Sequence, residues 1–157
     1  MAELKYQCLI YDKRDRERCE TFEEKIVPGE WGLKICEDAY KTEMALKTKL
    51  DESCFHIEPG LTCIAMSEDR KILGFVAIYI DKEAKDLIIG HAYVRPEFRK
   101  KGVYKLMLER VNVFAQVTKM KRMVSFVYRS NGESMKTHHA LGFKQELVGY
   151  SKEVKDG

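Results

Sequence analysis

The sequence predicts a mixed α/β (α+β) fold with a mostly antiparallel central sheet. Three strand-like segments at 62–67, 72–80 and 87–94 follow one another with only charged turns between them, which is typical of an antiparallel meander. After these strands the spacing of the apolar residues changes to three- and four-residue steps, which predicts an amphipathic helix over 103–118. A further strand is predicted over 123–128. Because a helix joins two strands there, we expect these strands to be parallel with a right-handed crossover.

The remaining elements lie toward the two ends of the chain. A strand is predicted over 5–11, followed by helices over 15–27 and 33–50. After the β-α-β unit come a short helix over 132–140 and an alternating segment, 144–154, that predicts a last strand.

Size and composition fit one soluble globular domain over 1–157. The chain has 157 residues, of which 45% are hydrophobic and 34% charged. The longest apolar run, 72–80, is too short for a membrane helix, and the N-terminus lacks the apolar core of a signal peptide. We therefore expect a cytoplasmic protein without a membrane partner.

The cysteines indicate reduced thiols and no metal site. There are five of them, an odd number, and no two are closer than nine positions. Neither a disulfide framework nor a set of metal ligands has this spacing. They are Cys8, Cys19, Cys36, Cys54 and Cys63.

The charge is unevenly distributed, although the net charge is only +3. The stretch 95–144 has twelve Lys and Arg residues and three Asp and Glu residues, a balance of +9. The stretch 14–52 has eight Lys and Arg residues and eleven Asp and Glu residues, a balance of −3. The basic stretch suits a polyanionic ligand, and the acidic one either favours a cation or simply forms solvated helix faces. Because the basic residues lack interleaved stacking aromatics, we expect no nucleic-acid partner.

The start of the helix at 103–118 combines the features of a phosphate-binding turn. A helix N-terminus presents free backbone N–H groups and a partial positive charge, and Gly102 would let the backbone approach a ligand closely. Basic side chains surround this turn: Arg95, Arg99, Lys100, Lys101 and Lys105. A basic, solvated helix start would look similar, and the turn is neither a P-loop nor a Gly-x-Gly-x-x-Gly turn.

Two motifs resemble those of the GNAT superfamily of N-acetyltransferases. Val94-x-Pro96-x-x-Arg99-x-x-Gly102 is similar to the coenzyme A-binding motif of that superfamily. Asn131-x-x-Ser134-x-x-x-His138-x-x-x-Gly142-Phe143 is similar to the segment after its fifth strand. The resemblance implies acetyl-coenzyme A as co-substrate. It also implies a GNAT-type sheet with helices on both faces, whose parallel fourth and fifth strands splay apart.

The sequence departs from the family pattern at two positions. Tyr104 stands where the family has Gly or Ala, so its ring must point away from the pyrophosphate or pack along the cofactor. His138 stands where the family has a Tyr that protonates the coenzyme A thiolate, a task that an imidazolium can also perform.

The resemblance implies two proton-transfer residues and a set of cofactor contacts. His91 is the candidate base, because it lies three residues before Val94, where many members carry a Glu; the alternative is a structural hydrogen bond. His138 is the candidate acid, and the alternative is a packing role with Tyr128 or Tyr150 supplying the proton. The expected cofactor-binding residues are Tyr93, Val94, Arg99, Lys100, Lys101, Gly102, Val103, Tyr104, Asn131 and Ser134.

Two further aromatic residues bear on the acceptor side of this site, next to a strand face that carries polar candidates. Strand alternation places His91 and Tyr93 on one face of the strand at 87–94. Trp31 and Tyr40 fall in the region where GNAT folds build the acceptor pocket, although core packing is the simpler interpretation of both.

We therefore expect an enzyme that transfers the acetyl group of acetyl-coenzyme A to a primary amine. The acceptor is expected to be small or medium-sized, with an aminoglycoside-like amine as the first candidate. Two alternatives stay open, namely acetylation of a protein or peptide amine, and a non-catalytic module that binds acetyl-coenzyme A as a sensor. A homodimer is compatible with the resemblance.

Overall fold

The internal contacts of the chain divide it into two units, Met1–Phe126 and Val127–Gly157. The computed structural model describes residues 5–13, 32–57, 60–127, 132–146, 152 and 154. The expectation of one domain over 1–157 stays a prediction.

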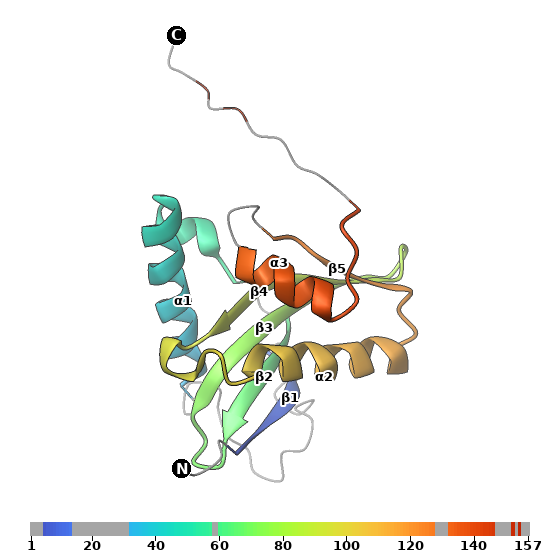
Figure 1. Ribbon diagram of the computed structural model, residues 1–157, viewed down its shortest axis with the longest axis horizontal. Helices are drawn as coiled ribbons and strands as arrows, with labels where there is room; N and C mark the ends of the chain where they lie inside the picture. Colours follow the sequence, from blue (N-terminus) through green and yellow to red (C-terminus); the bar gives the residue numbers. More distant parts are fainter. Residues whose placement is uncertain are drawn as a thin grey trace. The chain divides into compact units, whose positions relative to one another are not determined.

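Five strands of the first unit form one sheet in the order β1-β2-β3-β4-β5 (Figure 1). They are β1 (Tyr6–Asp12), β2 (Leu61–Ser67), β3 (Ile72–Asp81), β4 (Asp86–Val94) and β5 (Arg122–Ser125). Neighbours from β1 to β4 are antiparallel, whereas β4 and β5 are parallel. This arrangement confirms the predicted mixed, mostly antiparallel sheet, and the first four strands begin and end within one residue of the predicted bounds.

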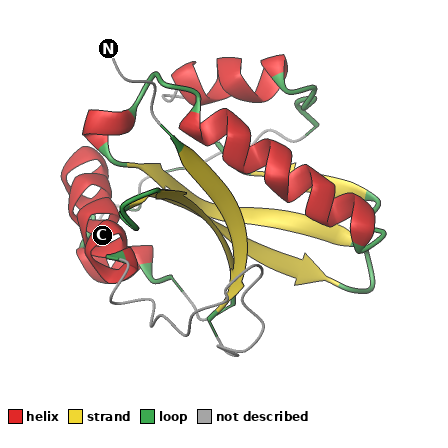
Figure 2. Ribbon diagram, turned by 90° about the horizontal axis from the view of Figure 1, so that it is seen from below, coloured by secondary structure: helices red, strands yellow, loops and turns green. Residues whose placement is uncertain are grey.

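Two α-helices of this unit cover opposite faces of the sheet (Figure 2). They are α1 (Leu33–Thr48) and α2 (Val103–Val117). Their buried residues recur at three- and four-residue steps: Leu33, Cys36 and Tyr40 in α1, and Val103, Met107, Leu108, Val111 and Ala115 in α2. The apolar stripe therefore makes each helix bury one side against the sheet. None of the described helices is long and apolar enough to cross a membrane.

The described residues of the first unit also form two short 3₁₀ turns, which were not predicted. They are η3 (Glu52–Phe55) and η4 (Pro96–Phe98). The carboxylate of Asp51 caps η3 by accepting a 2.8 Å hydrogen bond from the Ser53 amide, while η4 begins with a proline, whose fixed φ suits the first position of a turn.

The second unit contains α3 (Gly132–Ala140), which coincides with the predicted helix. The prediction of a last strand over 144–154 is not met at 144–146, which have no regular structure, and most of the remainder lies outside the described residues. The predicted helix over 15–27 also lies outside them.

A β-bulge at Gly90 determines which way the end of β4 faces. The register between β3 and β4 steps from Ile78 opposite Ile89 to Ala77 opposite His91, so Gly90 is the extra residue. Ile89 therefore shares a face with Ile78, whereas His91 lies on the other face with Ala77, which packs in the core under α1. A side chain at Gly90 would collide with Tyr79, because a Cβ there would lie 2.0 Å from Cε2 of that ring.

The two parallel strands part at the same bulge. Their pairing runs from Asp86 opposite Arg122 to Ile89 opposite Ser125, and β4 then continues to Val94. The bulge interrupts the regular ladder, which accounts for β5 ending at Ser125 and not at the predicted position 128. The predicted separation of the fourth and fifth strands is confirmed.

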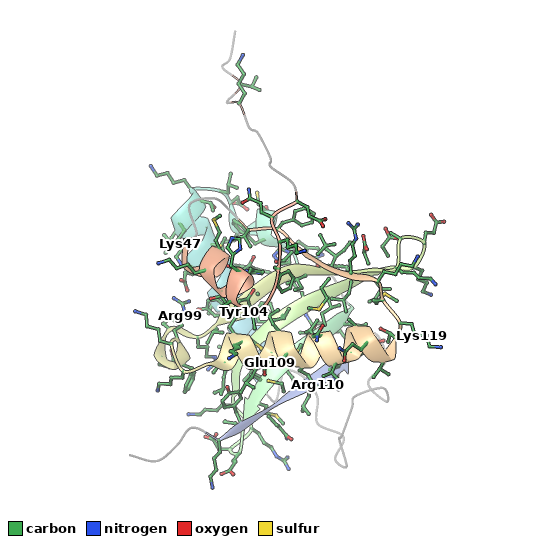
Figure 3. The ribbon with its side chains drawn as sticks, turned by 45° about the vertical axis from the view of Figure 1, so that its right-hand side comes forward. Lys47, Arg99, Tyr104, Glu109, Arg110 and Lys119 are labelled. Carbon is green, nitrogen blue, oxygen red and sulfur yellow. The ribbon has the colours of Figure 1, made fainter. Side chains whose placement is uncertain are left out.

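A charge network ties α1 to the end of β4. Two of its members, Arg99 and Lys47, are labelled in Figure 3. Arg99 donates from Nη2 to Glu43 Oε2 over 2.7 Å and from Nε to the carbonyl oxygen of Val94 over 2.9 Å. Lys47 contacts the other carboxylate oxygen of Glu43 at 2.7 Å. Burial acts to raise the pKa of Glu43, but the hydrogen bonds and charges of Arg99 and Lys47 outweigh it and hold the pKa at about 2.

The network predicts a pH-dependent part of the folding stability. The pKa of Glu43 is depressed from 4.5 to about 2, so its ionised form stabilises the fold above the ordinary value, and that contribution is lost as the pH falls toward 2. Glu43→Gln should lower the free energy of unfolding at pH 7 by about 1 kcal/mol, allowing for solvent screening. Urea titrations of both proteins at several pH values should show the difference shrinking between about pH 5 and pH 2. Glu68→Gln, on the exposed turn after β2, is the control, and a difference that persists unchanged to pH 2 would contradict the assignment.

Candidate active site

The end of β4 and helix α1 bring His91 and Tyr40 into contact. The Tyr40 hydroxyl oxygen lies 2.7 Å from His91 Nδ1. Tyr40 is only 6% exposed, and its ring meets three other aromatic rings edge-on: those of Tyr93, Phe75 and Phe55, at centroid distances of 5.8, 5.7 and 6.2 Å. Tyr40 is therefore a core residue, as the simpler interpretation of the sequence had it, and it is also the partner of the candidate base. The sequence offered no signal for this second role.

The surroundings of His91 favour its neutral form. Burial lowers its pKa below 6.5, and the charges of His56 and Lys41 act in the same direction. A hydrogen bond with the backbone of His56 opposes them, as a carbonyl oxygen that accepts from a ring N–H does. If one ring nitrogen carries that proton, Nδ1 is left to accept from the Tyr40 hydroxyl. In this arrangement His91 works together with Tyr40 and not as an isolated imidazole.

Tyr93 shares the face of His91, as strand alternation predicts. Burial, followed by the nearby carboxylate of Glu43, raises the pKa of Tyr93 to about 12, so its phenol stays protonated at neutral pH. The guanidinium carbon of Arg99 lies 5.4 Å from the centroid of the Tyr93 ring. With its side chain enclosed in this way, Tyr93 can offer a ligand only its backbone.

Within the described residues, the backbone of β4 beyond the bulge has no strand paired with it on the side of β5. Alternate residues of a strand direct their N–H and C=O groups to opposite edges, and the β4–β5 pairing ends at Ile89. Between Gly90 and Val94, some peptide groups therefore point into the gap between the two strands. An extended chain that carries amide groups could pair with them as an added strand does.

The turn before α2 has the backbone geometry of an anion site. Lys100 has φ 61° and Gly102 has φ 80°, and Gly102 is the N-cap without a side-chain hydrogen bond. The first hydrogen bond within the helix is donated by the Leu106 amide to the Gly102 carbonyl oxygen, over 3.1 Å. The amides before Leu106 therefore have no acceptor within the helix. A Cβ built on Gly102 would meet no atom within 4 Å, which leaves open space beside this residue. The turn thus fits a phosphate group.

The side chains of this turn divide into three groups. Lys100 and Lys101 are exposed, and the Lys101 ammonium lies 5.9 Å from the centroid of the Phe98 ring. Val103 is only 2% exposed, so it can offer a ligand only its amide. Tyr104 is partly exposed on the first turn of α2 (Figure 3).

Arg99 lies in a different environment from the one expected of a phosphate ligand. Two of its nitrogens bind Glu43 and the Val94 carbonyl, and its guanidinium covers Tyr93. Nothing in the sequence identifies Glu43 as the residue that engages it. A direct contact between Arg99 and the cofactor stays a prediction.

In the second unit, α3 pairs Ser134 with His138. His138 is 7% exposed, and its Nδ1 lies 2.6 Å from the Ser134 carbonyl oxygen and 3.3 Å from Ser134 Oγ. A carbonyl only accepts, so Nδ1 carries the proton in this contact. The ring also packs against Phe143, at a centroid distance of 5.0 Å. The roles of Ser134 and His138 at the cofactor stay predictions, and Asn131 lies outside the described residues.

No group of three or more His, Cys, Asp or Glu side chains with the geometry of a metal site occurs in the part of the chain that the structure describes. The residues at β4 and α2 instead match a ligand with a phosphate group at one end and an amide-bearing arm. Coenzyme A has this form: the turn at Gly102 suits its pyrophosphate, and the edge of β4 suits its pantetheine arm.

Comparisons with known proteins agree with this geometry. The profile of the acetyltransferase (GNAT) family matches residues 28–143. A solved structure titled AAC(6')-Iy in complex with the bisubstrate analogue CoA-S-monomethyl-acetylneamine is 26% identical, with a TM-score of 0.50; the match covers 60% of this chain and 69% of that one.

Two more distant structures match over nearly their whole length. The ribosomal-protein-alanine N-acetyltransferase from Brucella melitensis biovar Abortus 2308 is 14% identical with a TM-score of 0.64, over 96% of this chain and 100% of that one. The aminoglycoside acetyltransferase meta-AAC0020 from an uncultured soil metagenomic sample, in complex with sisomicin, is 11% identical with a TM-score of 0.59, over 98% and 97%. These two show the shared fold.

No curated protein sequence matches the chain. The family profile nevertheless covers most of its length, and the splayed strands and the phosphate-type turn are the parts of the fold that this family needs. The chain therefore belongs to the GNAT acetyltransferase family, whose members use acetyl-coenzyme A as acetyl donor.

Proposed function

We propose that the protein transfers the acetyl group of acetyl-coenzyme A to a primary amine of a small or medium-sized acceptor. One observation carries the catalytic part of this proposal: the 2.7 Å contact between the Tyr40 hydroxyl and His91 Nδ1 lies on the strand that borders the gap between β4 and β5. When bound, acetyl-coenzyme A supplies an activated acyl group as a thioester.

Two parts of the first unit hold the cofactor in this proposal. The amides at the start of α2, with Gly102, Lys100 and Lys101 beside them, bind the pyrophosphate. The backbone of Tyr93 and Val94 pairs with the pantetheine arm, and an amide there faces the thioester oxygen. Arg99 supports the site indirectly, because it fixes the Val94 carbonyl and α1 in place.

Tyr40 and His91 together remove the proton of the attacking amine. The amine passes a proton to the Tyr40 oxygen through a water molecule, because Tyr40 is too buried for direct contact, while the Tyr40 hydroxyl proton moves to His91 Nδ1. The imidazolium that forms keeps its other N–H on the His56 backbone. Since burial lowers the pKa of His91, the ring is neutral and ready to accept a proton at neutral pH.

His138 is the proposed proton donor to the departing thiolate. Its Nδ1 contact with the Ser134 carbonyl fixes the orientation of the ring, and an imidazolium is a suitable acid near neutral pH. This role comes from the position of His138 in the second motif.

The similarity to AAC(6')-Iy supports a small, amine-rich acceptor. That structure carries an analogue that joins coenzyme A to a monomethyl-acetylneamine, and an aminoglycoside-like amine is accordingly the first candidate here. Acetylation of a protein or peptide amine is the second candidate, and binding without transfer is the third. A homodimer and a cytoplasmic location stay predictions.

An acceptor screen tests the proposed function. Release of free thiol from acetyl-coenzyme A should be measured with aminoglycosides, polyamines, amino acids and short peptides. At least one small amine should support turnover well above the rate of spontaneous hydrolysis. Turnover with peptides alone would favour the second candidate, and tight binding of acetyl-coenzyme A without thiol release for any acceptor would contradict catalysis.

Gly102→Val tests the phosphate turn. A β-branched residue at φ 80° strains the turn and covers its amides, so the KM for acetyl-coenzyme A should rise by about tenfold, which corresponds to about 1.4 kcal/mol of lost binding. Lys119→Val is the matched control, because Lys119 has φ 59° at the other end of α2 (Figure 3). An unchanged KM in the Gly102 variant, or an equal rise in the control, would refute the turn assignment.

Tyr40→Phe tests the proton relay. The ring and its packing remain, but His91 loses its hydroxyl partner, so kcat should fall by about a hundredfold, which is typical of a lost acid–base group. His91→Ala should cause a similar loss and flatten the acid limb of the pH profile, and the double variant should be little worse than either. Tyr79→Phe, another hydroxyl deletion on the same face, is the control. Additive losses, or full activity in Tyr40→Phe, would exclude the relay.

A further inference from the structure

Two cysteines outside the acetyl-transfer site lie next to each other in the sheet. The register between β1 and β2 pairs Cys8 with Ala65 and Ile10 with Cys63. Residues two apart on a strand share a face, so Cys8 and Cys63 are diagonal neighbours on the same face of the sheet. Cys63 is fully buried, with its Sγ 3.7 Å from the Met107 carbonyl of α2, whereas Cys8 is only partly buried.

Cys8 opens onto a groove between β1 and α2. The groove has a volume of about 340 Å³. Its lining residues are Tyr6, Cys8, Leu106, Glu109, Arg110 and Val113. Leu106 and Val113 are 45% and 49% exposed and form apolar walls, while Glu109 and Arg110 lie next to each other on α2 (Figure 3). The groove thus gives small apolar molecules access to one thiol of the pair.

The surroundings favour the thiolate of Cys8. The pKa of Cys8 is lowered, first by a hydrogen bond from the Cys63 thiol and then by the charge of Arg110, while burial and the charge of Glu109 oppose the shift without cancelling it. The single S–H of Cys63 can point to the Met107 carbonyl while Cys8 is protonated and turn to the Cys8 sulfur once that thiol ionises. The partly exposed thiol is therefore the nucleophile, and the buried thiol is its hydrogen-bond donor.

We propose that Cys8 and Cys63 form a hydroperoxide-sensitive dithiol, in which Cys8 is oxidised first and Cys63 resolves it to a disulfide. The Cys8 thiolate attacks one oxygen of the hydroperoxide; the O–O bond breaks, Cys8 becomes a sulfenic acid, and the alkoxide or hydroxide that leaves takes up a proton. The Cys63 sulfur then attacks the Cys8 sulfur. The S–S bond forms, the S–O bond breaks, and hydroxide leaves with the proton of Cys63 as water. A thiol reductant reverses the change.

The walls of the groove favour an organic hydroperoxide over hydrogen peroxide. Leu106 and Val113 can contact an alkyl or aryl group. Arg110 also lines the groove and can stabilise the negative charge that develops on the departing oxygen, whereas Glu109 acts in the opposite sense. None of these residues belongs to the proposed acetyl-transfer site, so the inference does not depend on the proposed function.

The test is to treat the reduced full-length protein at pH 7 with one equivalent of cumene hydroperoxide or of hydrogen peroxide and to map its cysteines by mass spectrometry. The wild type should lose two hydrogens and yield a linked Cys8–Cys63 peptide pair, faster with cumene hydroperoxide. Cys63→Ser should stop at a Cys8 sulfenic acid that dimedone traps. Arg110→Gln should slow oxidation of Cys8 by about threefold, whereas Lys119→Gln at the end of α2 should not.

Cys54 provides the internal control, because it is more exposed than Cys8 and should, on accessibility alone, react first. Oxidation of Cys54 before Cys8, or a disulfide from Cys8 to any cysteine other than Cys63, would overturn the proposal. If Cys63→Ser does not fold, Cys63→Ala replaces it. The peptide map of the wild type identifies the cysteines that form the disulfide without either variant.

Discussion

The β-bulge at Gly90 is the constraint on which the rest of the site depends. Without the extra residue, strict alternation would put His91 on the face of Ile89, which lies opposite Ile78 on the other side of the sheet from α1. The bulge moves His91 and Tyr93 to the face covered by α1 and at the same point ends the pairing of β4 with β5. One inserted residue thereby separates β4 from β5 and sets the orientation of His91, the candidate base. The ring of Tyr79 occupies the space that a side chain at Gly90 would need, so any larger residue there would have to displace that ring.

Helix α1 then fixes the end of β4 through two contacts of different kinds. Tyr40 packs among aromatic rings and reaches His91 with its hydroxyl, while Glu43 holds Arg99, which in turn holds the Val94 carbonyl. Tyr40 and Glu43 are three residues apart and therefore lie on one side of α1. The apolar contact sets the depth of the helix on the sheet, and the ionic contact sets its position along β4. A base that must meet its substrate within hydrogen-bond distance needs both.

Much of the fold could be predicted from the sequence, because it is encoded in local patterns. The meander, the helices on both faces and the separation of β4 from β5 follow from hydrophobic period, charged turns and two motifs. The bulge could not be derived in the same way, since Gly90 alone does not tell a bulge from an ordinary strand residue. The strand prediction to 128 was too long for the same reason. The partners of the site residues, Tyr40 and Glu43, come from a helix some fifty residues away in sequence, and no local pattern encodes such a contact.

Tyr104, which departs from the family pattern, is compatible with a phosphate-binding turn because of the geometry of α2. Val103 points into the core, and a helix turns by about 100° per residue, so the ring of Tyr104 leaves the core on a different side from Val103 while its amide stays in the first turn. A large side chain there does not by itself remove the amides that bind phosphate. Arg99, the basic residue that the motif shares with the family, is occupied with Glu43 and Val94. In the proposed site, anion recognition at this turn would therefore depend mainly on backbone amides and on exposed lysines, and Arg99 would chiefly hold the end of β4 in place.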